Sequence, residues 1–164
     1  VKGVEMEIPS GEGMRTFPLK GTLDKVEVID GEKVSVTDYK TGKWKTRNQL
    51  EGKTKDADGN YYRQLVFYKL LLSKEPKGKK RMVSGEIDFL EPDEKGNFHR
   101  ESFAPTDEEV SELEALIRGV AADIAGLSFW EKRCDDKECE YCLLSEEVKK
   151  PEPENKKPAS KKLG

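Results

Sequence analysis

The stretch GTLDKVEVIDGEKVSVTDYKTG, residues 21–42, decides the fold. Apolar and polar residues alternate on both sides of Asp30-Gly31-Glu32, which is the pattern of two half-buried strands joined by a hairpin loop. The alternation predicts antiparallel strands within residues 17–29 and 33–40. With a three-residue loop between them, Asp24 lies directly opposite Asp38, and both continue a row of valines that is expected to face the core.

Two aspartates aligned with a core face are costly unless positive charge lies beside them. Lys40 follows Asp38 by two residues, so it shares the same face of the strand and can supply one such charge. Mg²⁺ or Mn²⁺ can supply the rest, because these ions prefer oxygen ligands, and a nearby lysine can orient or help deprotonate an attacking water. The pattern indicates phosphodiester hydrolysis; the alternative is that Asp24, Asp38 and Lys40 are ordinary surface charges.

Three motifs in this order resemble those of RecB-type nucleases of the PD-(D/E)XK superfamily. They are GTLDKV at residues 21–26, VTDYKTG at residues 36–42 and QLVFY at residues 64–68. The resemblance implies a restriction-endonuclease-like fold, which is a mixed α/β (α+β) arrangement with a central sheet flanked by helices. Three motifs in the correct order are much more specific evidence for this family than any one motif alone.

The resemblance also implies a role for each matching residue. Asp24, Asp38 and the backbone carbonyl of Tyr39 would bind the metal, and Lys40 would be the catalytic lysine. Gln64 and Tyr68 would face the DNA, and their spacing of four places both on one side of a helix. Taken alone, Gln64 fits a solvated helix position and Tyr68 a core aromatic.

The chain departs from the RecB-like pattern at its start. Such nucleases add a metal-binding His or Glu from a helix before the first strand, and the sequence shows no such helix there. Glu5 or Glu7 could supply the ligand, although Val4, Met6 and Ile8 alternate with them and leave both glutamates on the opposite face.

The rest of the chain predicts the elements around this hairpin. A continuous apolar run over residues 61–73 favours a largely buried helix, and two further strands are expected at 81–90 and 97–103. Thr106 and Glu109 form a capping-box pattern that starts another helix. Between the hairpin and the first helix, Lys43, Trp44 and Lys45 could form a DNA-contacting loop in which Trp44 stacks on a base, or simply a solvated charged loop.

The cysteines Cys134, Cys139 and Cys142 have the spacing of a metal or cluster site. The group resembles the iron–sulfur sites of AddB-type nucleases and CRISPR adaptation exonucleases, where a cysteine from upstream of the nuclease core completes the cluster. Zinc with a further ligand such as His99, and three reduced thiols that hold nothing, are the alternatives.

Length and composition limit the other possibilities. The chain has 164 residues, of which 38% are charged, and it lacks an apolar stretch of membrane-spanning length or a secretory leader, so a cytoplasmic protein is expected. We expect a nuclease domain at residues 1–145 that lacks its N-terminal helix, a cysteine-rich segment at 128–145 and a disordered charged tail at 146–164. The net charge of -3 disfavours phosphate binding over a broad surface but permits it through a metal ion.

These observations predict a Mg²⁺- or Mn²⁺-dependent deoxyribonuclease. By resemblance it would be the C-terminal module of a UvrD/RecB-type ATP-dependent DNA helicase in recombination or repair, with the motor in the same or a partner chain. A standalone exonuclease would keep the chemistry and change only the context. The alternative of another class is a non-catalytic DNA-binding or structural accessory domain of a helicase.

Overall fold

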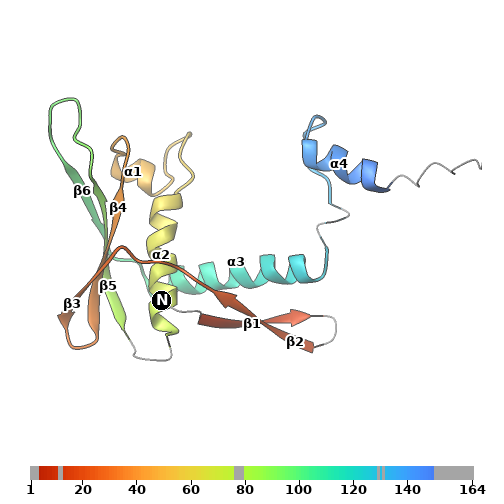
Figure 1. Ribbon diagram of the computed structural model, residues 1–164, viewed down its shortest axis with the longest axis horizontal. Coiled ribbons are helices and arrows are strands. Elements are labelled where there is room, and N and C mark those ends of the chain that lie inside the picture. The colour runs from red at the N-terminus through yellow and green to blue at the C-terminus, as the bar shows by residue number, and fades with distance from the viewer. Residues whose placement is uncertain (1–3, 11–12, 76–79, 129, 131, 150–164) are drawn as a thin grey trace, which may run out of the picture. The chain divides into compact units, whose positions relative to one another are not determined.

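The computed structural model describes residues 4–10, 13–75, 80–128, 130 and 132–149 (Figure 1). The chain divides into two compact units, Val1–Gly126 and Leu127–Gly164, so the boundary falls inside the domain expected at residues 1–145. The first unit holds both sheets and the helices α1 to α3, and the second holds α4.

A four-stranded mixed sheet is the centre of the first unit. Its strands are β3 (Lys25–Asp30), β4 (Lys33–Lys40), β5 (Arg81–Phe89) and β6 (His99–Phe103), in that spatial order. The outer pairs are antiparallel, whereas β4 and β5 are parallel and are connected through helix α2 (Asn60–Ser73), which crosses one face of the sheet (Figure 1). A sheet of this kind flanked by helices confirms the predicted mixed fold.

The predicted register of the β3–β4 hairpin is confirmed. Val26 pairs with Val36 and Lys25 pairs with Thr37, as a three-residue loop would require. The connection itself is one residue shorter, because β3 ends at Asp30 and β4 begins at Lys33, and an irregularity between Val28 and Asp30 compensates for the difference.

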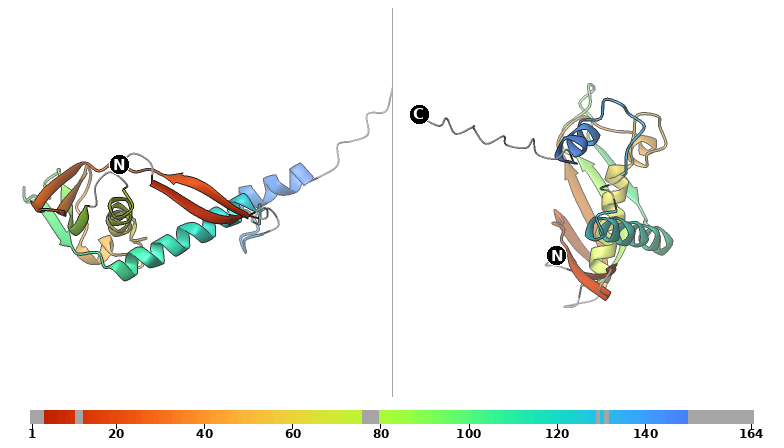
Figure 2. Two further views of the ribbon diagram at one scale, coloured as in Figure 1. Left: turned by 90° about the horizontal axis from the view of Figure 1, so that it is seen from below. Right: turned by 90° about the vertical axis from the view of Figure 1, so that its right-hand side faces the viewer.

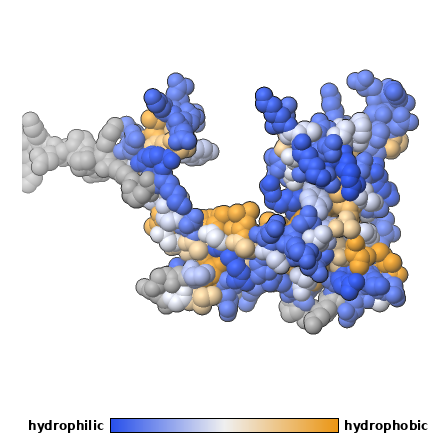
Figure 3. Space-filling model, turned by 180° about the vertical axis from the view of Figure 1, so that it is seen from behind, coloured by the Kyte–Doolittle hydropathy of each residue, from blue (hydrophilic) through white to orange (hydrophobic). Residues whose placement is uncertain are grey.

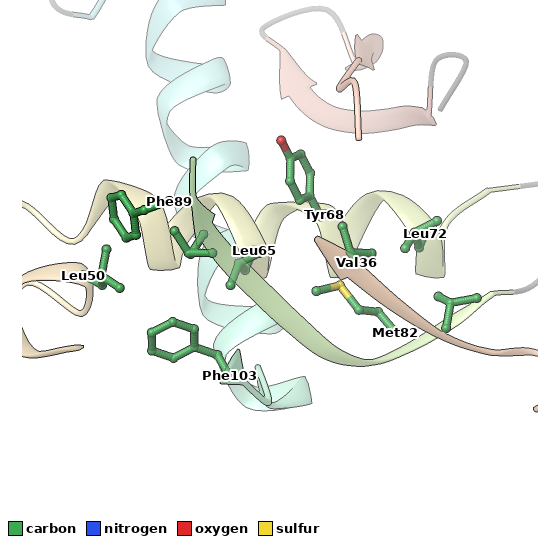
Figure 4. Packing of buried hydrophobic residues seen from close by; sticks show 10 residues of the cluster. Val36, Leu50, Leu65, Tyr68, Leu72, Met82, Phe89 and Phe103 are labelled. Carbon is green, nitrogen blue, oxygen red and sulfur yellow. The ribbon is translucent and has the colours of Figure 1, made fainter. Parts of the chain in front are cut away.

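The core forms where α2 packs on β4 and β5 (Figure 4). Gly85 in the middle of β5 allows this close approach, because a Cβ atom there would lie 2.6 Å from the end of Met82 and 3.1 Å from Leu65. The buried cluster consists of Val34, Val36, Leu50, Leu65, Tyr68, Leu72, Met82, Ile87, Phe89 and Phe103.

The expectation that both halves of the valine row face the core is wrong for β3. Val34 and Val36 are fully buried, but Val26 is 37% exposed and Val28 is 62% exposed. The reason is that β3 is the edge strand and α2 packs mainly on β5 and β4, so the core ends before it covers β3.

The strand predicted within residues 17–29 is in fact two strands in different sheets. β1 (Val4–Ser10) pairs with β2 (Gly13–Leu19) in a separate hairpin, and the chain then leaves this hairpin to begin β3 at Lys25. Gly21 lies in the connection against α2, where a Cβ atom would come within 2.5 Å of Leu71. Residues 20–24 belong to neither strand.

Helix α3 (Asp107–Ala125) begins at the predicted capping box. The Thr106 side chain accepts a hydrogen bond from the Glu109 amide, and the Glu109 carboxylate accepts one from the Thr106 amide. The β1–β2 hairpin lies along α3 in Figures 1 and 2, with Val4, Met6 and Ile8 buried. Toward its end α3 exposes apolar side chains, among them Val120 and Ile124. Figure 3 shows apolar side chains at the surface of the protein.

Two helices differ from the expectations. The short helix α1 (Arg47–Leu50) begins at a capping box formed by Thr46 and Gln49, and α4 (Glu140–Lys149) follows the cysteine segment. Residues 146–149 of the expected disordered tail are therefore helical, and residues 150–164 lie outside the described part. None of the helices described is both long and apolar enough to cross a membrane.

Candidate active site

Asp38 lies near the end of β4 with only 2% of its surface exposed. Its Oδ1 accepts a hydrogen bond of 2.8 Å from the Tyr68 hydroxyl. Its Oδ2 is 2.7 Å from the Lys40 ammonium, an ion pair, but no hydrogen bond with suitable geometry reaches this buried oxygen from the described residues. One oxygen of a buried carboxylate therefore retains its acceptor capacity.

Asp24 lies one residue before β3, beside the end of β4. Its Oδ2 accepts a hydrogen bond of 3.0 Å from the backbone amide of Tyr39, the residue after Asp38. The β3–β4 pairing ends at Lys25 and Thr37, so the Tyr39 carbonyl lies beyond the paired part of this edge. The structure thus brings Asp24, Asp38 and the Tyr39 backbone to one end of two neighbouring strands.

Helix α2 supplies the polar side chains that hold Lys40. The Lys40 ammonium donates a 2.7 Å hydrogen bond to Oε1 of Gln64, and Nε2 of Gln64 donates a 2.5 Å hydrogen bond to the Tyr68 oxygen. Because Tyr68 in turn donates to Asp38, which pairs with Lys40, the four side chains form a closed ring. Gln64 and Tyr68 share a helix face, as predicted, and that face contacts the site.

The Tyr68 hydroxyl is held in its neutral form. Burial raises the pKa of Tyr68 well above its usual value, and the hydrogen bond to the Asp38 carboxylate raises it further. A neutral phenol keeps its proton available to Asp38, so Tyr68 acts as a permanent donor at neutral pH.

Tyr61 is a site residue that the sequence reasoning missed. The ammonium groups of Lys40 and Lys45 each lie 4.6 Å from the centroid of its ring. Tyr61 precedes Gln64 by three residues on α2, so helical spacing from the QLVFY motif was the signal that could have identified it.

The loop after β4 carries the other predicted DNA contacts. Lys43, Trp44 and Lys45 are all exposed, and the Trp44 ring stacks on His99 with centroids 4.1 Å apart. His99, which the sequence offered as a further zinc ligand, instead contacts Trp44 and lies 2.9 Å from an Asp93 carboxylate oxygen.

Glu5 and Glu7 lie on β1, in the separate hairpin. Both side chains are exposed on the face opposite the buried Val4 and Met6, as the alternation implied. Among the described residues, neither glutamate side chain makes a hydrogen bond or ion pair with Asp24 or Asp38, so the structure does not bring these glutamates into the constellation.

The donors at the strand ends fit a hard divalent cation. Two carboxylates and a backbone carbonyl offer the oxygen ligands that Mg²⁺ and Mn²⁺ prefer. The buried Asp38 Oδ2, which has a charge partner and no hydrogen bond, is the oxygen best prepared for such a ligand role.

The three cysteines come together in the second unit. Their sulfur atoms all lie within 4.8 Å of one another, and those of Cys134 and Cys142 are 3.6 Å apart. A hydrogen bond from the Cys142 amide lowers the pKa of Cys139, which immediately precedes α4, whereas hydrogen bonding to Cys139 raises that of Cys134. Cys139 therefore ionises more readily than Cys134 does.

Comparison with known families identifies the superfamily of the chain. The model of the PD-(D/E)XK nuclease superfamily matches residues 2–146, so the chain belongs to this superfamily and contains a nuclease domain. Nucleases of this superfamily typically use Mg²⁺ or Mn²⁺. Neither the curated proteins nor the solved structures gave a match.

Proposed function

We propose that this chain is a Mg²⁺- or Mn²⁺-dependent deoxyribonuclease domain of the RecB-like type. Asp24, Asp38 and the Tyr39 carbonyl are the metal ligands, and Lys40 is the catalytic lysine. The observation that carries the proposal is the buried Asp38 carboxylate, which pairs with Lys40 and keeps one oxygen without a hydrogen bond.

The bound metal would polarise the scissile phosphate and make an attacking water more acidic. Lys40 supplies a positive charge at the reacting phosphate and orients the water. Gln64 and Asp38 hold its ammonium from two sides, each at 2.7 Å, so the position of that charge is fixed before substrate binds.

The DNA-binding residues fall into two groups by what they contact. Gln64 and Tyr68 are occupied by Lys40 and Asp38, so they position those groups while facing the substrate. Lys43 and Lys45 are exposed in the loop after β4 and can neutralise phosphates on the strand that approaches the site.

Cleavage of labelled DNA in Mn²⁺ by the wild-type chain and its Asp38→Asn variant tests the proposal. Asparagine keeps the shape and the acceptor for Tyr68 but removes the charge, so we expect activity to fall by at least about 100-fold while the fold is kept. Lys33→Ala, at the other end of β4, is the matched control and should cut at the wild-type rate. Equal cutting by Asp38→Asn would refute the site; DNA binding without any cutting would favour the accessory-domain alternative.

We also propose that the domain acts beside a UvrD/RecB-type helicase motor in recombination or repair. The support is the set of three RecB-like motifs, whose residues meet in one constellation. A motor would deliver unwound strands to the site. Degradation of blunt duplex DNA should therefore rise when a UvrD-type helicase and ATP are added, and an unchanged rate would count against this pairing.

The three cysteines are proposed to bind a soft metal, as zinc or as an iron–sulfur cluster completed by a further ligand. The clustered sulfur atoms and the lowered pKa of Cys139 support this assignment. Elemental analysis of protein purified without oxygen should find zinc or iron that is lost in Cys139→Ser. A wild-type chain with neither metal, in a form that still cuts DNA, would favour plain thiols.

A further inference from the structure

A cleft of about 710 Å³ lies between the loop after β4 and the connection from β5 to β6. Trp44 and His99 line it on one side, and Glu91, Asp93 and Glu94 come from the β5–β6 connection. The cleft lies in the first unit and is separate from the ring formed by Asp38, Lys40, Gln64 and Tyr68.

Contacts with His99 and Asp93 hold the aromatic wall of the cleft in place. The Trp44 and His99 rings stack with an angle of 21° between their planes, and His99 Nε2 is hydrogen bonded to Asp93. The Asp93 side chain also accepts hydrogen bonds from the backbone amides of Lys95 and Asn97, both at 2.9 Å. His99 is therefore tied to a structured turn, and it holds the indole ring in place.

Asp93 stays ionised over the neutral range and below. The hydrogen bond from His99, followed by that from the Asn97 amide, lowers the pKa of Asp93 well below its usual value. His99 thus has a constant acceptor. Trp44 remains 38% exposed, so part of the indole is available to a ligand.

The charges around the cleft favour a base over a phosphate. Three carboxylates, those of Glu91, Asp93 and Glu94, outnumber the two ammonium groups of Lys43 and Lys95. Such a rim does not attract a phosphate, whereas a nucleobase is neutral and stacks well on an exposed aromatic ring.

The cleft lies two β-strands away from Lys40, the proposed catalytic lysine, in the same row of the sheet. Lys40 pairs with Phe89 across β4 and β5, and Phe89 pairs with His99 across β5 and β6. Two strand spacings separate the Lys40 and His99 backbones by about 10 Å. That distance corresponds to roughly three stacked nucleotides of one strand.

We propose that this cleft binds one unpaired nucleobase of the DNA strand being cut, by stacking on Trp44, with His99 and Asp93 as positioning residues. The inference rests on the proposed nuclease function and adds a specificity determinant to it. A base can stack there only when it has left the duplex, so the cleft favours single-stranded or frayed DNA.

Trp44 fluorescence in a Lys40→Ala, Trp130→Phe background tests the cleft without requiring cleavage. The background leaves Trp44 as the single tryptophan of the two. We expect a short oligothymidylate to quench this fluorescence, and a base-free strand of the same length not to quench it. Trp44→Ala, followed by anisotropy of a labelled strand, should raise the Kd for oligothymidylate about 10-fold and leave that for the base-free strand unchanged.

Two substitutions of His99 distinguish the loss of ring stacking on Trp44 from a general loss of folded structure. His99→Phe keeps a ring behind Trp44 and should retain most of the affinity for oligothymidylate, whereas His99→Ala should lose as much as Trp44→Ala does. In the active enzyme, the Trp44→Ala and His99→Ala substitutions should raise KM for single strands and leave kcat within about twofold.

Equal quenching by the base-free strand, or an unchanged Kd in Trp44→Ala, would overturn the base site even if the domain cuts DNA. Absence of cleavage with base-dependent quenching intact would instead refute the nuclease proposal alone.

Discussion

Replacement of Lys40 by alanine should destabilise the protein as well as inactivate it. Lys40 is the counter-charge of a carboxylate whose side chain is 3% exposed, and the lysine side chain itself is 17% exposed. Loss of one partner from a buried ion pair costs about 3–5 kcal/mol because the other charge is left uncompensated. Since Lys40 retains some solvent contact, we expect the lower end, about 3 kcal/mol, or a fall in Tm of about 9 °C at roughly 3 °C per kcal/mol.

A divalent cation should reverse part of this loss, because it replaces the missing positive charge beside Asp38. In EDTA the variant should show the full deficit in free energy of unfolding. At Mn²⁺ concentrations about 100 times the Kd, binding to the native state would add about 2.7 kcal/mol. At one common Mn²⁺ concentration the variant should gain more than the wild type does, because the cation replaces a charge that only the variant lacks.

Urea unfolding followed by circular dichroism, in EDTA and in Mn²⁺, measures both effects. Lys45→Ala is the matched control, because Lys45 is exposed and lies at the same 4.6 Å from the Tyr61 ring as Lys40 does. It should cost less than about 1 kcal/mol. If Lys40→Ala in EDTA were as stable as Lys45→Ala, the buried Asp38–Lys40 ion pair would not contribute the expected stability.

Three further predictions concern stability. Burial, and after it hydrogen bonds to carboxylates, raises the pKa values of Tyr62 and Tyr68 above those in the unfolded chain, so the resulting stability is complete below about pH 10 and is lost above it. Absorbance titration should show late ionisation of both phenols, and Tyr62→Phe should remove one of these late steps. Thr106→Ala removes the α3 cap and should cost about 1 kcal/mol in urea unfolding; an effect below about 0.3 kcal/mol would contradict the capping box. Gly85→Ala crowds Met82 beneath α2 and should cost about 1–3 kcal/mol, with an unchanged Tm as the contrary result.

The hairpin and its register could be predicted because they depend on local pattern. Alternation in residues 21–42 and a short turn were enough to pair Val26 with Val36. The exposure of Val26 and Val28 could not be predicted, since it depends on how far α2 reaches across the sheet. Alternation identifies a face of a strand, but only packing decides whether that face is covered.

The candidate site was predictable only in part as well. Asp24, Asp38 and Lys40 followed from parity and motif, and Gln64 and Tyr68 from a motif with helical spacing. The closed ring formed by Asp38, Lys40, Gln64 and Tyr68 could not be predicted, because it needs the packing of α2 against β4. At the break between β2 and β3, Gly21 lies against α2, and this contact joins residues that are distant in sequence.

The short helix α1 and the stacking of Trp44 on His99 were not predicted from the sequence. Thr46 and Gln49 have the spacing of a capping box, which marks α1, although a helix of four residues lacks the apolar period that identifies longer ones. His99 is the single histidine of the chain, and its stacking on Trp44 joins the start of β6 to the loop after β4, which are far apart in sequence. Neither segment by itself predicts the other.

The rate at which the Lys40→Ala variant cuts a labelled single strand in Mn²⁺, relative to the wild type, tests the proposed site most directly. We expect metal-dependent cutting by the wild type and a loss of at least about 100-fold in the variant, measured at a temperature where both remain folded. Cutting at the wild-type rate by a folded Lys40→Ala variant would contradict the assignment of this site.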